Sequence, residues 1–204
     1  MATTIPAQRQ AQQPGVQHEM EPRPSVTRQA YKPADKLKGK IAPITGGDSG
    51  IGRSVAHHFA LEGAAVAFTY VSPREDKDAQ EALRLLRDAQ RPEHKQPLAI
   101  PVDLGLHDNC KEVCAASHEG GQLHHQHHGI RVNGLAPGPV WTPLVPASYE
   151  EKHVEGFGKQ VPMKRVAQPD EIAPSYVFLA CDDSSYFTGQ MLHPNGESIG
   201  LLCA

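Results

Sequence analysis

Thr45-Gly46-Gly47-Asp48-Ser49-Gly50-Ile51-Gly52 follows an apolar segment at 40–45 and leads into a helical pattern. We call this stretch the glycine turn. Gly46 and Gly50 allow backbone angles that other residues avoid, and Gly52 lets the start of the helix approach a phosphate closely. The positive end of a helix suits the charge of a pyrophosphate. A strand, such a turn and a helix in this order predict a dinucleotide cradle, and the further strand–helix units that follow strengthen the prediction.

Apolar strand-like segments alternate with amphipathic helical patterns beyond the glycine turn. Continuous apolar strands between helices predict an α/β fold with a Rossmann-like, doubly wound parallel sheet covered on both faces. Pro43 is an unusual residue for a central strand, and we expect His57 and His58 to face solvent. The expected strands lie at 40–45, 64–70, 98–102, 130–135 and 191–194, and the expected helices at 50–62, 75–90, 108–118 and 169–180.

The first 34 residues differ in composition from the rest of the chain. They are rich in Gln, Pro, Arg and Glu and hold few large apolar side chains, so they cannot bury enough surface to fold alone. We predict an extended or disordered N-terminal arm, which either lies across a neighbouring subunit or stays mobile. Residues 35–204 are expected to form a single dinucleotide-binding domain with a break around 119–129.

Composition excludes several classes of partner. The chain has 204 residues, 39% of them apolar, and a formal net charge of −3, so no nucleic-acid partner is indicated. No apolar stretch is long enough to cross a bilayer, and the start of the chain lacks the pattern of a secretory signal. We therefore expect no membrane partner and a cytoplasmic location. The four cysteines form no disulfide or zinc pattern and are expected to be reduced thiols.

A histidine-rich segment lies at the break. His124, His125, His127 and His128 have a spacing that suits a metal ion, but no carboxylate or cysteine completes a ligand set nearby. A solvated junction is the better interpretation, so we expect no physiological metal site. Two cysteines at 110 and 114 are more typical of a helix core than of a redox pair.

The residues quoted so far resemble the short-chain dehydrogenase/reductase family, in particular its glucose and ribitol dehydrogenase branch. The glycine turn is similar to the family's TGxxxGxG motif, and resemblance extends over nearly the whole chain outside the histidine-rich segment. It implies hydride transfer between a nicotinamide cofactor and a carbonyl or alcohol of a sugar, polyol or aldehyde. The cofactor-binding residues that the resemblance and the turn indicate are Thr45, Gly46, Asp48, Ser49, Gly50, Ile51, Gly52, Arg53, Tyr70, Asp103, Leu104, Pro137, Gly138, Val140 and Thr142.

The family's catalytic residues have no counterpart in this sequence. An Asn-Asn-Ala-Gly type motif, a serine and a Tyr-x-x-x-Lys pair are all missing, as though two βα units had been removed before residue 129. In the family the tyrosine moves the proton, the lysine lowers its pKa and the serine orients the carbonyl. Tyr149 and Lys152 are the nearest substitute, but an exposed helical pair is the better interpretation. We therefore assign no catalytic residue.

The choice of cofactor depends on the end of the second strand. An acidic residue there would bind the ribose hydroxyls of NAD, but this sequence has Tyr70. Arg53, and with it Arg74, has the forked donors that suit a 2′-phosphate, so NADP is favoured and NAD stays open. The alternative for Arg53 is a position on the helix surface.

Two interpretations of function remain open. The first is a short-chain dehydrogenase/reductase-type, NADP-dependent oxidoreductase with weak or no turnover. The second is a non-catalytic dinucleotide-binding or regulatory subunit, or a truncated product without function. The sheet is expected to be abridged, with 130–135 filling the vacant place beside the first strand. Exposed apolar surface would then alter assembly, as a homo-oligomer or as a hetero-oligomer with full-length relatives.

Overall fold

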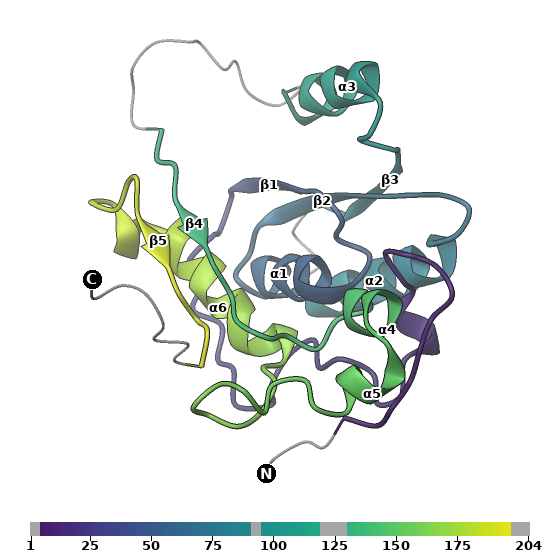
Figure 1. Ribbon diagram of the computed structural model, residues 1–204. Helices are drawn as coiled ribbons and strands as arrows, with labels where there is room; N and C mark the ends of the chain where they lie inside the picture. The colour runs from purple at the N-terminus through teal and green to yellow at the C-terminus, as the bar shows by residue number, and fades with distance from the viewer. Residues whose placement is uncertain (1–4, 91–94, 119–129, 197–204) are drawn as a thin grey trace.

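Three parallel strands form the main sheet of the computed structural model, which describes residues 5–90, 95–118 and 130–196. The strand order is β1-β2-β3, and Ile41 pairs with Ala65 while Ala67 pairs with Leu98. The strands are β1 (Ile41–Ile44), β2 (Ala65–Tyr70) and β3 (Leu98–Pro101), and the helices between them are α1 (Gly50–Leu61) and α2 (Asp76–Ala89). The α/β class and the Rossmann-like arrangement predicted from the sequence are thereby confirmed (Figure 1).

The second half of the described chain adds short helices and a second, two-stranded sheet. Here β4 (Gly134–Leu135) pairs in parallel with β5 (Met191–Leu192). The remaining elements are α3 (His107–His118), α4 (Leu144–Ser148), α5 (Glu151–Val154), α6 (Pro169–Ala180) and two 3-10 turns, η1 (Gln17–Glu19) and η2 (Asp182–Ser184). Helix α6 packs along α1, so the second half lies against the first through helices (Figure 1).

Only one face of the main sheet carries packed helices in the described part of the chain. Side chains from Ala42, Ile44, Val66 and Phe68 pack into the main core with α1 and α2. On the other face Ile41 is 50% exposed. The expected cover on both faces is therefore not seen among the described residues, and the sheet is abridged as predicted.

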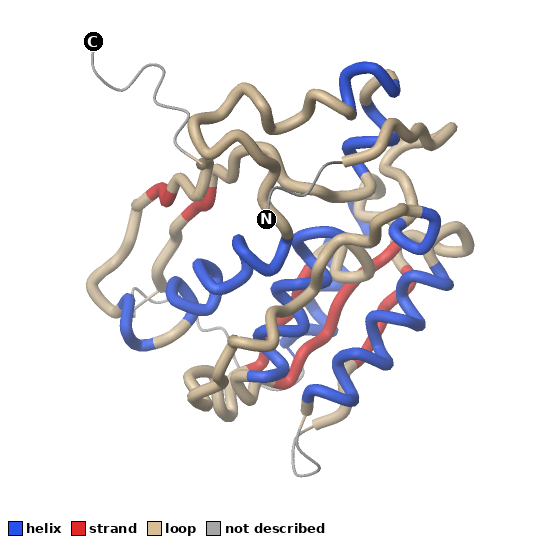
Figure 2. Tube along the Cα trace, turned by 90° about the horizontal axis from the view of Figure 1, so that it is seen from below, coloured by secondary structure: helices blue, strands red, loops and turns tan. Residues whose placement is uncertain are grey.

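The predicted place of residues 130–135 is wrong. Only Gly134–Leu135 forms a strand, and it pairs with β5, not with β1. Figure 2 shows this short pair apart from the three-stranded sheet. Among the described residues β1 is thus an edge strand, which explains Pro43. The carbonyl of Lys40 accepts from the amide of Ala65, so the alternation of a parallel ladder directs the nitrogen of Pro43 away from β2. On that side no described strand loses a ladder hydrogen bond.

Helix α1 shows how local sequence sets its ends. It begins after Ser49 and ends before Gly63, whose φ of +90° is a conformation that glycine adopts easily. His57 and His58 are buried, so the expectation that they face solvent is wrong. The ring of His58 packs edge-on against Tyr31, and its Nδ1 donates to the carbonyl of Ser54 at 2.8 Å. The ring is buried because α6 and the arm cover this side of the helix.

The N-terminal arm lies against its own chain from residue 5 onward. Ile5 and Met20 are buried in a second core with Trp141, whose indole N–H donates to the carbonyl of Pro22 at 2.8 Å. Farther along, the carboxylate of Glu62 accepts hydrogen bonds from the Tyr31 hydroxyl and from the amides of Ala34 and Lys36. No helix among the described residues is long and apolar enough to span a membrane.

Candidate functional site

A hollow of about 360 Å³ lies at the carboxyl ends of β1, β2 and β3, the place where ligands bind in open α/β sheets. Six of the fifteen residues predicted to bind the cofactor line it. Its walls are formed by Pro14, Gly46, Asp48, Ser49, Thr69, Tyr70, Val71, Glu75, Val102, Asp103, Leu104 and Gly105. We call it the β-end cavity.

The glycine turn is held tightly against β2. The amide of Gly46 donates to the hydroxyl of Thr69 and that of Gly47 to the carbonyl of Thr69, each at 3.2 Å. A side chain at Gly52 has no room, because a Cβ there would lie 2.0 Å from the carbonyl oxygen of Gly46. The turn therefore requires glycine at this place, and α1 starts directly beside the cavity.

Residues 137–142 approach the glycine turn from the second half of the chain. A Cβ built on Gly50 would lie 3.3 Å from the side chain of Thr142. Trp141 anchors this segment, since it is fully buried and its backbone amide donates to the carbonyl of Ala167. The two stretches that the resemblance assigns to one cofactor are thus side by side at Gly50 and Thr142. Val140 is buried, however, and bridges to Ala167, so it presents little surface to a ligand.

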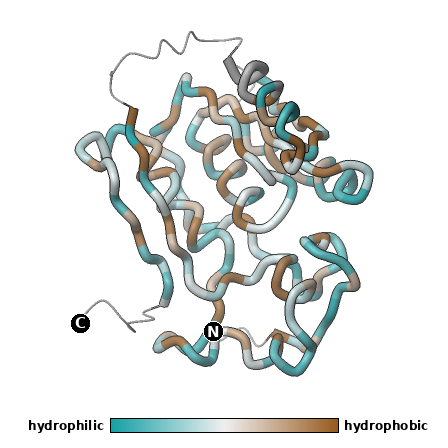
Figure 3. The backbone as a smooth tube through the Cα atoms, turned by 45° about the horizontal axis from the view of Figure 1, so that its top comes forward, coloured by the Kyte–Doolittle hydropathy of each residue, from teal (hydrophilic) through white to brown (hydrophobic). Residues whose placement is uncertain are grey.

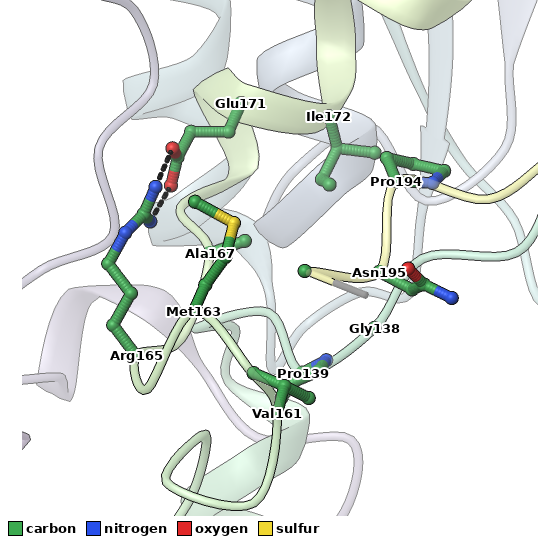
Figure 4. A pocket seen from close by; sticks show the side chains of 11 residues that line it. Gly138, Pro139, Val161, Met163, Arg165, Ala167, Glu171, Ile172, Pro194 and Asn195 are labelled. Carbon is green, nitrogen blue, oxygen red and sulfur yellow. Dashed lines mark hydrogen bonds and ion pairs between the residues drawn. The ribbon is translucent and has the colours of Figure 1, made fainter. Parts of the chain in front are cut away.

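A second, smaller pocket of about 170 Å³ lies behind this segment (Figure 4). Gly138 and Pro139 form one wall and Ile172 of α6 another. Arg165 and Glu171 close one side with two hydrogen bonds of 2.6 and 2.7 Å. Its walls are mostly apolar and its one ion pair is satisfied internally, so the pocket offers no fixed charge to a ligand.

Arg53 does not occupy the position predicted for a phosphate-binding residue. Its side chain is 3% exposed and its guanidinium bonds to the carboxylate and carbonyl of Asp78 and to the carbonyl of Asp48. Burial lowers the pKa of Arg53, and the neighbouring Asp78 opposes that change. The interpretation of Arg53 as a residue on the helix surface is therefore wrong, because the arginine braces α1 against α2. Its role as a phosphate ligand stays a prediction, which these internal partners do not favour.

The β-end cavity has an acidic lining. Asp48, Glu75 and Asp103 all contribute to it, and the amide of Val71 donates to Glu75 at 2.7 Å. Burial, and then the charge of Glu75, raises the pKa of Asp48 to about 6. Arg74 lies between the lining residues Val71 and Glu75 in the sequence. Its guanidinium donates to the carbonyls of Gln12 and Gln13 on the arm.

Of the tyrosines, Tyr70 lines the β-end cavity, but no lysine stands four residues after it. The chain has five tyrosines, and all of them lie within the described ranges. Tyr31 bonds to Glu62, and Tyr186 is fully exposed. Tyr149 is 47% exposed and packs on Phe157, while Lys152 pairs with Glu150 at 2.8 Å. Both side chains are exposed, as the alternative interpretation expected, but they do not share a helix, because Tyr149 lies between α4 and α5 and only Lys152 belongs to α5.

Three residues that the structure places at or behind the site belong to no recognised sequence motif. Pro14 lines the β-end cavity, and Gln17 and Asp78 contact the glycine turn or its supporting arginine. The arm has the composition of a disordered segment, so nothing local predicted its contacts. Only the aliphatic residues within it, such as Met20, gave a sign that part of it is buried.

No group of three or more potential metal ligands occurs among the described residues. The histidine-rich segment at 124–128 lies outside the described residues. Of the cysteines, Cys110 and Cys181 are free thiols.

Comparison with known proteins gives matches along the chain. The family model described as "short chain dehydrogenase" matches residues 40–123, and the model described as "Enoyl-(Acyl carrier protein) reductase" matches residues 121–196. The chain is 43% identical to "Glucose and ribitol dehydrogenase homolog 2" of Arabidopsis thaliana, over 98% of this chain and 99% of that protein. It is 40% identical to "NADPH-dependent aldehyde reductase 1, chloroplastic" of the same plant, over 94% and 97%.

The fold is similar to solved structures as well. One is described as a blue fluorescent protein from a metagenomic library in complex with NADPH, with a TM-score of 0.66, 19% identity, and coverage of 81% of this chain and 100% of that chain. The alignment with the first Arabidopsis protein runs over 286 positions, whereas this chain has 204 residues, so at least 82 positions hold no residue of this chain.

Proposed function

Because this chain belongs to the short-chain dehydrogenase/reductase family, we propose that it binds NADP(H) in the β-end cavity and has lost most or all of its turnover. The ancestral activity that we infer is NADP-linked oxidation or reduction of a sugar, polyol or aldehyde. The observation that carries the proposal is a cofactor cradle in a chain that has no Tyr-x-x-x-Lys pair.

The position of the cavity supports the binding half of the proposal. In this fold class a dinucleotide lies across the carboxyl ends of the strands, with its pyrophosphate at the start of the first helix. Gly46, Asp48 and Ser49 line the cavity at that point, and Tyr70 and Asp103 line it at the ends of β2 and β3. Thr142 lies next to Gly50, where the cofactor's other half would extend. When bound, the cofactor would supply the hydride chemistry.

NADP is preferred to NAD on two grounds. One relative is named as NADPH-dependent, and β2 ends in Tyr70 instead of the acidic residue that binds ribose hydroxyls. With Arg53 committed to Asp78, the residue left to meet a 2′-phosphate is Arg74, which the arm holds near the end of β2. NAD stays the alternative, because the cavity itself is lined by carboxylates.

The missing Tyr-x-x-x-Lys pair supports the loss of turnover. General acid catalysis is typically worth about 10²–10⁴-fold in rate, and none of the five tyrosines stands four residues before a lysine. We place the positions absent from the chain at the junction around 119–129, where the Ser and Tyr-x-x-x-Lys residues of the family would lie.

The test of this proposal is NADP-linked turnover of glucose, ribitol and simple aldehydes by the purified chain. We expect rates at least 100-fold below those of a full-length relative assayed in parallel. A Tyr149→Phe variant tests whether Tyr149 replaces the family's catalytic tyrosine as proton donor. Its residual rate should equal that of the unmutated chain. Turnover comparable to the relative, or its loss in Tyr149→Phe, would refute the proposal.

A regulatory subunit is the second candidate function. It is favoured by a formed cavity and by an edge of β1 that pairs with no other described strand, since a chain that binds cofactor without using it can still pair with another subunit. Mixing with a full-length relative distinguishes the two: a regulatory subunit changes that relative's rate or assembly. A truncated product without function would neither bind dinucleotide nor alter the relative.

The cellular location is proposed to be cytoplasmic. One relative is named as chloroplastic, so the location needs a direct test. Imaging of the chain fused to a fluorescent protein at its C-terminus would decide it, and accumulation in an organelle would overturn this part of the proposal.

A further inference from the structure

We propose that Gln17, in the N-terminal arm, is a positioning residue for the dinucleotide site, because it fixes the backbone of the glycine turn at Gly50. This inference rests on the proposed function, since it assigns a role in binding the same cofactor.

The arm runs directly along the site before it reaches Gln17. The amide of Gln10 donates to the carbonyl of Pro146 in α4 at 2.8 Å, and the arm's carbonyls at Gln12 and Gln13 accept from Arg74. Pro14 then forms part of the wall of the β-end cavity. The arm is therefore a component of the site and not only a cover for the hydrophobic core.

Gln17 makes two short contacts from a buried position. It is 2% exposed, and its side-chain oxygen accepts the amide of Gly50 at 2.7 Å. Its own backbone amide donates to the carboxylate of Asp78, also at 2.7 Å. Gly50 is the first residue of α1, so its amide has no acceptor within the helix. A buried amide left without an acceptor is costly, and Gln17 removes that cost in one conformation of the turn.

Asp78 connects Gln17 to the cavity wall by a second route. Its carboxylate, which is fully buried, also binds the guanidinium of Arg53 at 3.2 Å. Arg53 in turn donates to the carbonyl of Asp48, a residue that lines the cavity. The arm thus holds both Gly50 and Asp48, and a shift of Gln17 would be transmitted to each.

The direction of approach shows that Gln17 supports the turn and does not compete with a ligand. Gln17 borders a separate hollow between the arm, α1 and α2, and it is not among the residues that line the β-end cavity. Its oxygen therefore occupies the amide of Gly50 from behind the turn, while Gly46, Asp48 and Ser49 face the cavity.

The variant Gln17→Met tests this role most directly. It keeps the length of the side chain and the backbone amide on Asp78, and it removes only the acceptor for Gly50. Ser25→Ala is the matched control, because Ser25 ties the arm to Asp170 at 2.9 Å, far along the arm from the turn. Gln17→Asn, whose amide is one methylene too short to reach Gly50, is measured as well in case Gln17→Met does not fold.

We expect the dissociation constant for NADPH, measured by fluorescence titration, to rise about tenfold in Gln17→Met and in Gln17→Asn and less than twofold in Ser25→Ala. Thermal melts of all variants allow comparison at similar losses of stability. Equal affinity in the Gln17 variants and the parent would overturn the inference. Tighter binding in the Gln17 variants would show that Gln17 competes with NADPH for the glycine turn. Equal weakening in Ser25→Ala would show a general loosening of the arm. Either result would also overturn the inference. If the parent binds no NADPH, the proposed function is wrong and the positioning role falls with it.

Discussion

Asp48 is the residue whose charge should control cofactor affinity near neutral pH. Its pKa of about 6 lies above the ordinary value of 3.8, because it is buried beside Glu75, so it loses its proton as the pH rises through 6. The new negative charge then faces the phosphates of a dinucleotide in the β-end cavity. We predict that NADPH affinity falls several-fold between pH 5 and pH 7.5.

The Asp48→Asn variant provides the control for this prediction. The 2′-phosphate of NADPH itself titrates near pH 6, and that part of the dependence persists in the variant. The part that Asp48 contributes should disappear, and the variant should bind more tightly than the parent at pH 7.5. Identical pH profiles for the two proteins would show that Asp48 does not face the phosphates.

A residue can be predicted from the sequence where backbone geometry demands it. Gly52 was identified from the sequence because a turn this tight excludes any side chain. Arg53 was not, since the sequence gives no sign of a partner 25 residues away, and the structure pairs it with Asp78. Gln17 was missed for the same reason, because its partner Gly50 is distant in sequence.

At the level of elements, helix α1 carries a buried histidine that should make stability depend on pH. Burial, and then the neighbouring His58, lowers the pKa of His57 from 6.5 to about 4. The unfolded chain therefore binds a proton between pH 6.5 and pH 4 that the folded chain does not. The stability that this group provides is complete above pH 6.5 and falls by about 3 kcal/mol as the pH drops to 4.

Urea unfolding at several pH values checks this prediction through His57→Gln. The variant should lose less stability on acidification than the parent, whatever its stability at pH 7. His153→Gln, at an exposed position of α5, should follow the parent curve. A parent and a His57→Gln variant with parallel pH curves would contradict the prediction.

The contact between α1 and α2 depends on a buried ion pair. Arg53 is 3% exposed and Asp78 is fully buried. Arg53→Met removes the arginine partner of the buried Asp78 carboxylate and leaves it the Gln17 amide and the His18 ring, and breaking a buried ion pair typically costs about 3–5 kcal/mol. Urea unfolding at pH 7 should show a loss of this size, and a much smaller loss for Lys36→Met, which breaks the exposed pair with Asp183. Similar effects of the two substitutions would show that the buried pair has no special role.

Element boundaries in the first half of the chain followed the sequence closely, since helix and strand periods and the residue Gly63 are local signals. The expected helix at 50–62 corresponds to α1, and the expected strand at 64–70 to β2. The strand expected at 130–135 is shorter and pairs elsewhere. Pairing partners are set by long-range contacts, so the apolar character of that segment predicted a strand but not its neighbour.

At the scale of the whole molecule, the open edge of β1 should alter assembly. An edge strand with free backbone groups and apolar neighbours is a template for association. Ile41 is 50% exposed, and Ile130 and Val132 are 72% and 70% exposed. Figure 3 shows hydrophobic and hydrophilic residues alternating along much of the backbone. We predict that the chain self-associates heterogeneously on size exclusion with light scattering.

An Ile41→Lys variant should reduce that association, because a charged side chain on an edge strand disfavours pairing. Leu144→Lys, at an exposed apolar position of α4, should leave it unchanged. A compact, stable tetramer formed by the parent chain would contradict this part of the account.

The central claim is that the chain keeps a dinucleotide cradle although its catalytic residues are missing. Fluorescence titration of NADPH into the purified chain tests it most directly, with Gly52→Val as the control because no side chain fits there. The account predicts saturable binding by the parent and none by Gly52→Val. Absence of binding to the parent, or equal binding to both proteins, would contradict it.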